Sequence, residues 1–135
     1  MSYLAAYVAA LLVFVLADIA WLSTMVDRIY RPALGDLLLS GVNFPPAIIF
    51  YLLYPAGLVI FAIIPALKSG NVATALMLGA LFGFFTYGTY DLTNQATLRS
   101  WSTTLTIADM AWGSFLGGLS AASAAWIVTK LFNQV

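Results

Sequence analysis

Apolar residues run along the chain in four long stretches, which polar or charged segments separate. These stretches cover approximately residues 3–26, 44–65, 72–91 and 103–130. Each is about as long as the 20 or so residues that a helix needs to cross the core of a bilayer. The pattern predicts an all-α integral membrane protein: a bundle of four transmembrane helices forming a single domain over residues 1–135. Because the number of spans is even, we expect both termini on the same side of the membrane.

The connecting segments add detail to this picture. Residues 32–39, which start with a proline, predict a short amphipathic turn or helix at the membrane interface between spans one and two. Asn43 is an expected N-cap of the second span. Pro55 lies in the middle of that span and predicts a kink, because proline removes one hydrogen bond of the helix and crowds the preceding turn. The link at residues 68–71 is short, which predicts that spans two and three are antiparallel neighbours.

Composition supports the membrane class and excludes several functions. The chain is 63% hydrophobic and only 7% charged, with a formal net charge of zero, so no basic surface is available for nucleic acid. It contains no histidine and no cysteine, which removes the usual ligands of zinc, haem and iron–sulfur clusters. A retinal Schiff base would need a lysine at mid-membrane, but Lys68 and Lys130 lie at the ends of spans. We therefore expect membrane lipids as partners, and no metal or other cofactor.

Small residues recur at four-residue spacing in the third and fourth spans. Such stripes let helices approach closely in a membrane, where packing rather than the hydrophobic effect drives association. The stripes are Ala75, Gly79 and Gly83 in span three, and Gly113, Gly117, Ala121 and Ala125 in span four. They predict a helix contact within the bundle or, alternatively, a homodimer seam through Gly79, Gly83, Gly113 or Gly117.

All five acidic residues are aspartates, and three of them fall within or at the end of a span: Asp18, Asp91 and Asp109. A charged side chain inside the bilayer is costly, so each one needs a structural or functional reason. Asp18 and Asp109 each lie roughly 10 Å inside the same face of the membrane, counted at 1.5 Å per helical residue. We expect these two side chains to face each other.

A short motif surrounds both of these aspartates. The segment Ala17–Ser23 is similar to the segment Ala108–Ser114, and in each copy a tryptophan follows the aspartate by three residues, on the same helix face. The tryptophans are Trp21 and Trp112. The similarity predicts two like walls of one cavity, although an alanine-rich chain can also produce such a match by chance.

The third span places further polar groups near these aspartates. Gly83, Tyr87 and Asp91 follow at four-residue steps and so share one face, which we expect to point inward. Arg99 is the nearest cation in sequence and the expected salt-bridge partner of one aspartate. Three carboxylates with one guanidinium cannot all stay charged in a low dielectric, so at least one is expected to hold a proton. The alternative is a purely structural network that binds the helices together.

Nine residues make up the candidate ligand-binding site, and other aromatic residues are expected only to pack or to lie at the interface. The nine are Asp18, Trp21, Tyr87, Asp91, Asn94, Gln95, Arg99, Asp109 and Trp112. The other aromatic residues considered are Tyr3, Tyr7, Tyr30, Tyr51, Tyr54, Trp101 and Trp126.

The polar end of the third span also carries a recognisable signature. It consists of Thr89-Tyr90-Asp91-Leu92-Thr93-Asn94, followed by Asp109, Trp112 and Gly113. This signature resembles that of a domain-of-unknown-function family of short bacterial four-helix inner-membrane proteins. The resemblance covers nearly the whole chain and implies a multi-pass protein of the bacterial inner membrane. It implies no activity, ligand or catalytic residue.

Three functions remain open at this point. The first is binding, with or without transport, of a small cationic or amphipathic ligand with proton coupling: Asp18 and Asp109 would hold the proton or cation, and the two tryptophans would stack on the ligand. The second is an enzyme that uses paired aspartates as acid and base on a lipid or isoprenoid. The third is an accessory subunit of a larger membrane complex.

Overall fold

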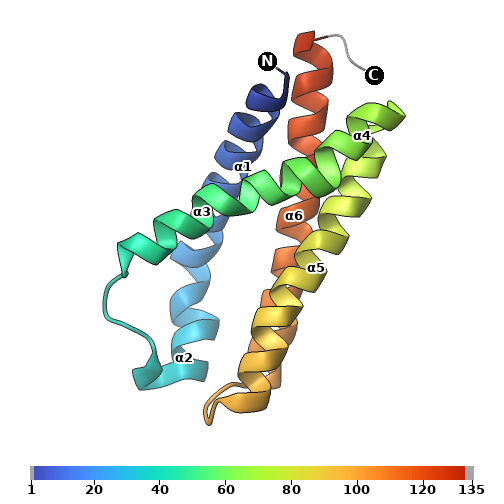
Figure 1. Ribbon diagram of the computed structural model, residues 1–135. Coiled ribbons are helices and arrows are strands. Elements are labelled where there is room, and N and C mark those ends of the chain that lie inside the picture. Colours follow the sequence, from blue (N-terminus) through green and yellow to red (C-terminus); the bar gives the residue numbers. More distant parts are fainter. Residues whose placement is uncertain (1, 133–135) are drawn as a thin grey trace.

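The computed structural model describes residues 2–132, and these form an all-α bundle with no strand (Figure 1). Four helical stretches are long and apolar enough to cross a membrane: Ser2–Leu37, Phe44–Ser69, Val72–Thr97 and Thr103–Phe132. The predicted fold class and the four spans are therefore confirmed. The two ends of the described chain lie together at one end of the bundle, as expected for an even number of spans (Figure 1).

The helices differ in how closely they pack. Helices α5 (Val72–Thr97) and α6 (Thr103–Phe132) run side by side along their length, and α1 (Ser2–Met25) packs mainly against α6. Helix α3 (Phe44–Leu58) crosses in front of them at a steep angle (Figure 1). It continues through a π-helical turn, η3 (Val59–Ile63), into α4 (Ile64–Ser69). This crossing closes the half of the bundle that carries the termini and leaves the other half more open.

The first span is longer and less regular than predicted. Helix α1 continues through a π-helical turn, η1 (Val26–Tyr30), into the short helix α2 (Arg31–Leu34) and a 3₁₀ turn, η2 (Gly35–Leu37). The expected short helix is thus present as α2, which turns sideways at the end of the first span (Figure 1). It is joined to the span directly and not through a separate loop.

Both π-helical turns stand in the same relation to a proline. In η1 the N–H of Arg31 donates to the carbonyl of Val26, and Pro32 follows; in η3 the N–H of Ile64 donates to Val59, and Pro65 follows. A proline ring crowds the carbonyl four residues earlier, and a wider turn relieves that crowding. The irregular turn of the second span therefore lies at Val59–Ile63, whereas Pro55, the predicted kink, lies within continuous α-helix.

The structure refines two local predictions about helix ends. Asn43 is the N-cap residue of α3, as predicted, but its side chain makes no capping hydrogen bond. Helix α5 does not end at Asp91 and continues to Thr97. In this polar segment each hydroxyl of Thr89, Thr93 and Thr97 donates to the carbonyl four residues earlier, so these side chains are satisfied without an interruption of the helix.

The glycine stripes of the third and fourth spans face each other inside the chain. A Cβ atom added at Gly83 would lie 2.1 Å from the carbonyl oxygen of Gly113, and one added at Gly79 would lie 2.4 Å from that of Gly117. These contacts are backbone against backbone, so no side chain can rotate away to make room. The predicted contact within the bundle is present, and all four glycines are buried by it.

We expect Gly83→Ala to destabilise the bundle, because the new methyl group would push α5 away from α6. Overpacking of this kind costs about 1–3 kcal/mol of folding free energy. Thermal unfolding in mild detergent measures the loss. Gly41→Ala is the matched control, because a Cβ at Gly41 meets nothing within 4 Å. Equal melting temperatures for the two variants would contradict the close α5–α6 contact.

Candidate functional site

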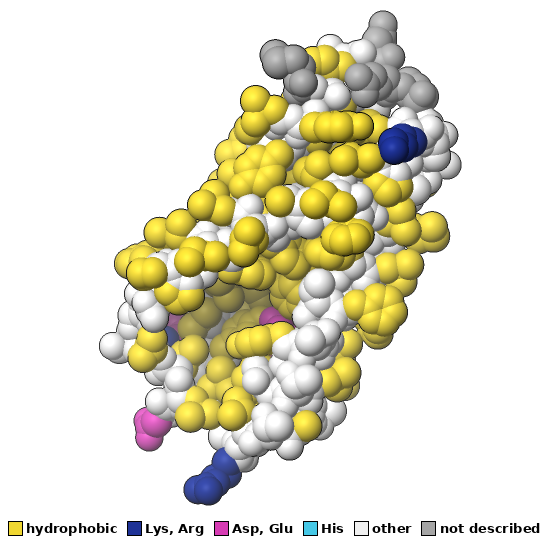
Figure 2. All heavy atoms as spheres, viewed as in Figure 1, with side chains coloured by type: hydrophobic (Ala, Val, Ile, Leu, Met, Phe, Trp, Pro, Cys, Tyr) yellow, Lys and Arg dark blue, Asp and Glu magenta, His cyan; other side chains and the backbone are white. Residues whose placement is uncertain are grey.

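A cavity of about 510 Å³ lies in the half of the bundle away from the termini. It opens sideways beneath α3, between α1 and α2 on one flank and α5 on the other (Figure 2). Its walls are mostly apolar, and acidic side chains are visible inside it (Figure 2). The residues that line it are Asp18, Leu22, Val26, Tyr30, Leu34, Leu38, Phe50, Tyr54, Thr86, Tyr87, Tyr90 and Asp109.

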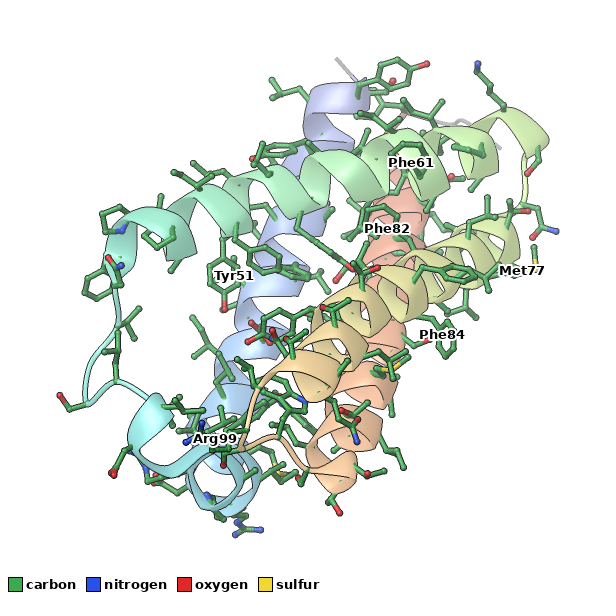
Figure 3. All side chains as sticks on the ribbon, turned by 60° about the horizontal axis from the view of Figure 1, so that its bottom comes forward. Tyr51, Phe61, Met77, Phe82, Phe84 and Arg99 are labelled. Atoms are coloured by element: carbon green, nitrogen blue, oxygen red, sulfur yellow. The ribbon has the colours of Figure 1, made fainter. Side chains whose placement is uncertain are left out.

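Asp18 is held by donors from two other helices. Its side chain is only 6% exposed, in the C-terminal third of the apolar α1. The hydroxyl of Tyr51 on α3 donates to one carboxylate oxygen, and the indole Nε1 of Trp112 on α6 donates to the other at 3.1 Å. Tyr51 points from α3 toward α1 (Figure 3). Because a buried carboxylate needs such donors to offset lost hydration, Asp18 links three helices at one point.

Asp109 on α6 has a similar arrangement. It is also 6% exposed, and it accepts a hydrogen bond from the hydroxyl of Tyr30 in η1. That hydroxyl in turn accepts one from the indole Nε1 of Trp21 at 2.9 Å. Each tryptophan is therefore linked to the aspartate of the other motif. Trp112 donates directly to Asp18, whereas Trp21 donates to Tyr30, which donates to Asp109. Both aspartates line the same cavity.

The two tryptophans pack against each other. The ring centroids of Trp21 and Trp112 lie 4.5 Å apart, and the ring planes differ by 6°. Neither ring lines the cavity. These rings were expected to stack on a ligand, but one face of each ring packs against the other tryptophan. The N–H groups of both rings donate hydrogen bonds within the polar network.

Asp91 lies behind the cavity wall. Its side chain is 0% exposed, and neither carboxylate oxygen has a hydrogen-bond partner among residues 2–132. It lies beside Asp109, across the α5–α6 contact. Tyr87, one turn earlier on α5, lines the cavity and lays its ring against Gly113. The inward face predicted for the third span is present, with Tyr87 in the cavity and Asp91 beyond it.

The remaining three candidate residues lie outside the cavity. Gln95 bonds to the hydroxyls of Thr103 and Thr106 and so ties the end of α5 to the start of α6. Asn94 does not line the cavity either. Arg99 is exposed on the loop between these helices (Figure 3).

The predicted salt bridge between Arg99 and a buried aspartate was wrong. Within the described chain the one ion pair joins Arg31 to Asp27, at 2.9 Å. The physical reason is that tyrosine and tryptophan N–H and O–H groups, which cost less to bury than a guanidinium, already supply the donors for Asp18 and Asp109.

A model of the DUF2177 family, described as a predicted membrane protein, matches residues 3–126 of the chain. The chain belongs to this family. The resemblance drawn from the Thr-Tyr-Asp-Leu-Thr-Asn signature is thereby confirmed, and with it the assignment as a multi-pass membrane protein. No curated protein and no solved structure gives a match. For this DUF2177 member the geometry of the cavity therefore carries the functional argument.

Sequence reasoning missed the two tyrosines that hold the aspartates of this DUF2177 protein, Tyr30 and Tyr51. For Tyr51 a signal was present: Tyr54 follows it by three residues, so two hydroxyls share one face of an otherwise apolar helix. The hydroxyl oxygens of Tyr54 and Thr86 share a hydrogen bond at 2.9 Å. Tyr30 carried no such signal, because its position depends on the π-helical turn that contains it.

We expect Tyr51→Phe to destabilise the DUF2177 fold, because Asp18 then keeps Trp112 as its remaining donor. Removing a hydrogen-bond donor from a buried acceptor lowers the free energy of unfolding by about 1–3 kcal/mol. The loss should shrink when Asp18→Asn is also present, since an amide accepts the Tyr51 hydrogen bond more weakly than a carboxylate and less remains to be lost. A double-mutant cycle of thermal unfolding in detergent measures this coupling. Tyr3→Phe, at a 53% exposed position, is the control; additive losses for Tyr51 and Asp18 would contradict the assignment.

Proposed function

We propose that the cavity binds an amphipathic molecule with one cationic or neutral head group, which enters sideways from the bilayer. The observation that carries this proposal is the pairing of two buried aspartates with largely apolar walls in one open cavity. In the bacterial inner membrane, which the signature implies, such a cavity is accessible to lipophilic molecules that partition into the membrane.

The chemistry of the polar end favours an amine or a hydroxyl over an anion. Asp18 and Asp109 are the charged residues among those that line the cavity, and no described lysine or arginine joins them. A phosphate or carboxylate head would meet like charge without a compensating cation. An ammonium group would be attracted to both carboxylates, and a hydroxyl could exchange hydrogen bonds with Tyr87 or Thr86.

The apolar end fits a chain or ring system of modest size. The apolar lining residues are Leu22, Val26, Leu34 and Leu38 from the first helical stretch and Phe50 from α3. Their burial against a ligand would replace contact with lipid tails, so apolar contacts alone give little affinity in a membrane. The head group interactions must therefore supply most of the specificity.

Binding is favoured over transport because the cavity occupies one half of the bundle. The other half is filled by fully buried residues from three spans, among them Phe14, Leu58, Ile63 and Leu116. Transport with proton coupling would require these residues to separate during a conformational change. Binding requires no such rearrangement.

The proposal predicts selectivity for head group charge. With dodecylamine and dodecanoate supplied at equal concentration to the detergent-purified protein, native mass spectrometry should show a one-to-one adduct at least tenfold more abundant for the amine. Asp18→Asn should reduce the amine adduct about tenfold, the effect of about 1.4 kcal/mol of lost attraction.

Asp36→Asn is the matched control for this experiment. It makes the same change of charge at an exposed position outside the cavity, and it should leave the amine adduct unchanged. Equal adducts for amine and carboxylate, or an amine adduct insensitive to Asp18→Asn, would refute the proposal.

A further inference from the structure

Asp91 is the most completely buried charged residue of the described chain, and the cavity does not reach it. Hydrogen bonds hold Asp18 and Asp109, but none reaches either oxygen of Asp91. A carboxylate in that position would be an uncompensated charge at membrane depth, which costs several kcal/mol even on lenient scales. The group next to it is another carboxyl, that of Asp109, so ionising both would add repulsion to the cost of burial.

The titratable groups around this pair offer no counter-charge. On the other elements they are Asp18 of α1 and Tyr30 of η1, and on α5 itself they are Tyr87 and Tyr90. The tyrosines donate hydrogen bonds or lie nearby as neutral groups, and Asp18 adds negative charge. The arginine of the one ion pair in residues 2–132, Arg31, is engaged by Asp27. A proton is therefore the simplest group that can make the contact between the two carboxyls favourable.

We propose that Asp91 and Asp109 share one proton across a carboxylic acid–carboxylate hydrogen bond, with Asp91 as the acid. The asymmetry of their partners assigns the roles. Asp109 already accepts a hydrogen bond from Tyr30, which stabilises the charged form, whereas Asp91 accepts none. The O–H group of Asp91 then donates a hydrogen bond to the carboxylate of Asp109, which accepts it in addition to the one from Tyr30. Two adjacent buried carboxyl groups do not both ionise, as in paired-carboxyl sites generally.

The position of the pair gives this proton a role in binding. Asp109 lines the cavity and Asp91 lies behind it, so the pair presents one negative charge to the cavity and keeps the second masked. An ammonium group bound against Asp109 would meet one negative charge on the pair, which matches its own single positive charge, so the proton on Asp91 couples the charge of the pair to that of the ligand. This coupling rests on the proposed function; the shared proton itself does not.

Infrared spectroscopy tests the shared proton without any ligand. The protein is studied near neutral pH in a maltoside detergent, which has no ester carbonyl to overlap the signal. The wild type should show the carbonyl stretch of a protonated carboxylic acid, shifted in D₂O. Asp91→Asn should abolish this band. Asp109→Asn should leave the band but move it to higher frequency, because an amide is a weaker acceptor than a carboxylate. Asp36→Asn, at an exposed site, should change nothing.

Three results would overturn the proposal: no such band in the wild type, a band that survives Asp91→Asn, or a band whose frequency ignores Asp109→Asn. If Asp91→Asn fails to fold, the wild type and Asp109→Asn still decide the question. The two proposals also fail separately. Loss of the infrared assignment leaves amine binding untouched, whereas absence of a dodecylamine adduct leaves the proton pair in place and removes only its coupling to a ligand.

Discussion

Buried carboxylates need hydrogen-bond donors, and this requirement determines how the half of the bundle around the cavity is built. Lipid supplies none, and the two cavity aspartates are each only 6% exposed. The chain meets this need with neutral aromatic donors from other helices: Tyr51 and Trp112 for Asp18, and Tyr30 for Asp109. Each of these bonds joins segments that are far apart in sequence. The same contacts that make the aspartates tolerable therefore hold α1, α3 and α6 in place around the cavity.

The tightly packed α5–α6 pair supplies the rigid part of this arrangement. Backbone contact at Gly79, Gly83, Gly113 and Gly117 fixes the distance between the two helices over several turns. That distance determines how Tyr87 lies against Gly113 and how close Asp91 comes to Asp109. A larger residue in the stripe would separate the carboxyl pair as well as the helices. Packing and site chemistry are thus controlled by the same four glycines.

Much of this could be predicted from the sequence, because hydropathy and helical spacing are local properties. The four spans, the glycine contact and the shared depth of Asp18 and Asp109 all follow from counting residues along helices. The partners of the aspartates did not follow, since they depend on how helices rotate relative to one another. Arg99 was favoured as a partner because it is the nearest cation in sequence, but it lies exposed on a loop. Two of the three donors, Tyr30 and Tyr51, are residues for which the sequence predicts only packing or an interfacial position, and the third is Trp112.

The π-helical turn at Val26–Tyr30 restricts where residues can be inserted into the chain or deleted from it. Relative to regular α-helix, such a turn contains one additional residue, and each residue corresponds to about 100° of rotation about the helix axis. Removing one residue from this segment could restore an unbroken α-helix while turning the Tyr30 hydroxyl away from Asp109. The loop at residues 38–43 carries no such constraint, because it is not helical. Among related chains, insertions and deletions should therefore accumulate in that loop and avoid the π-helical turn.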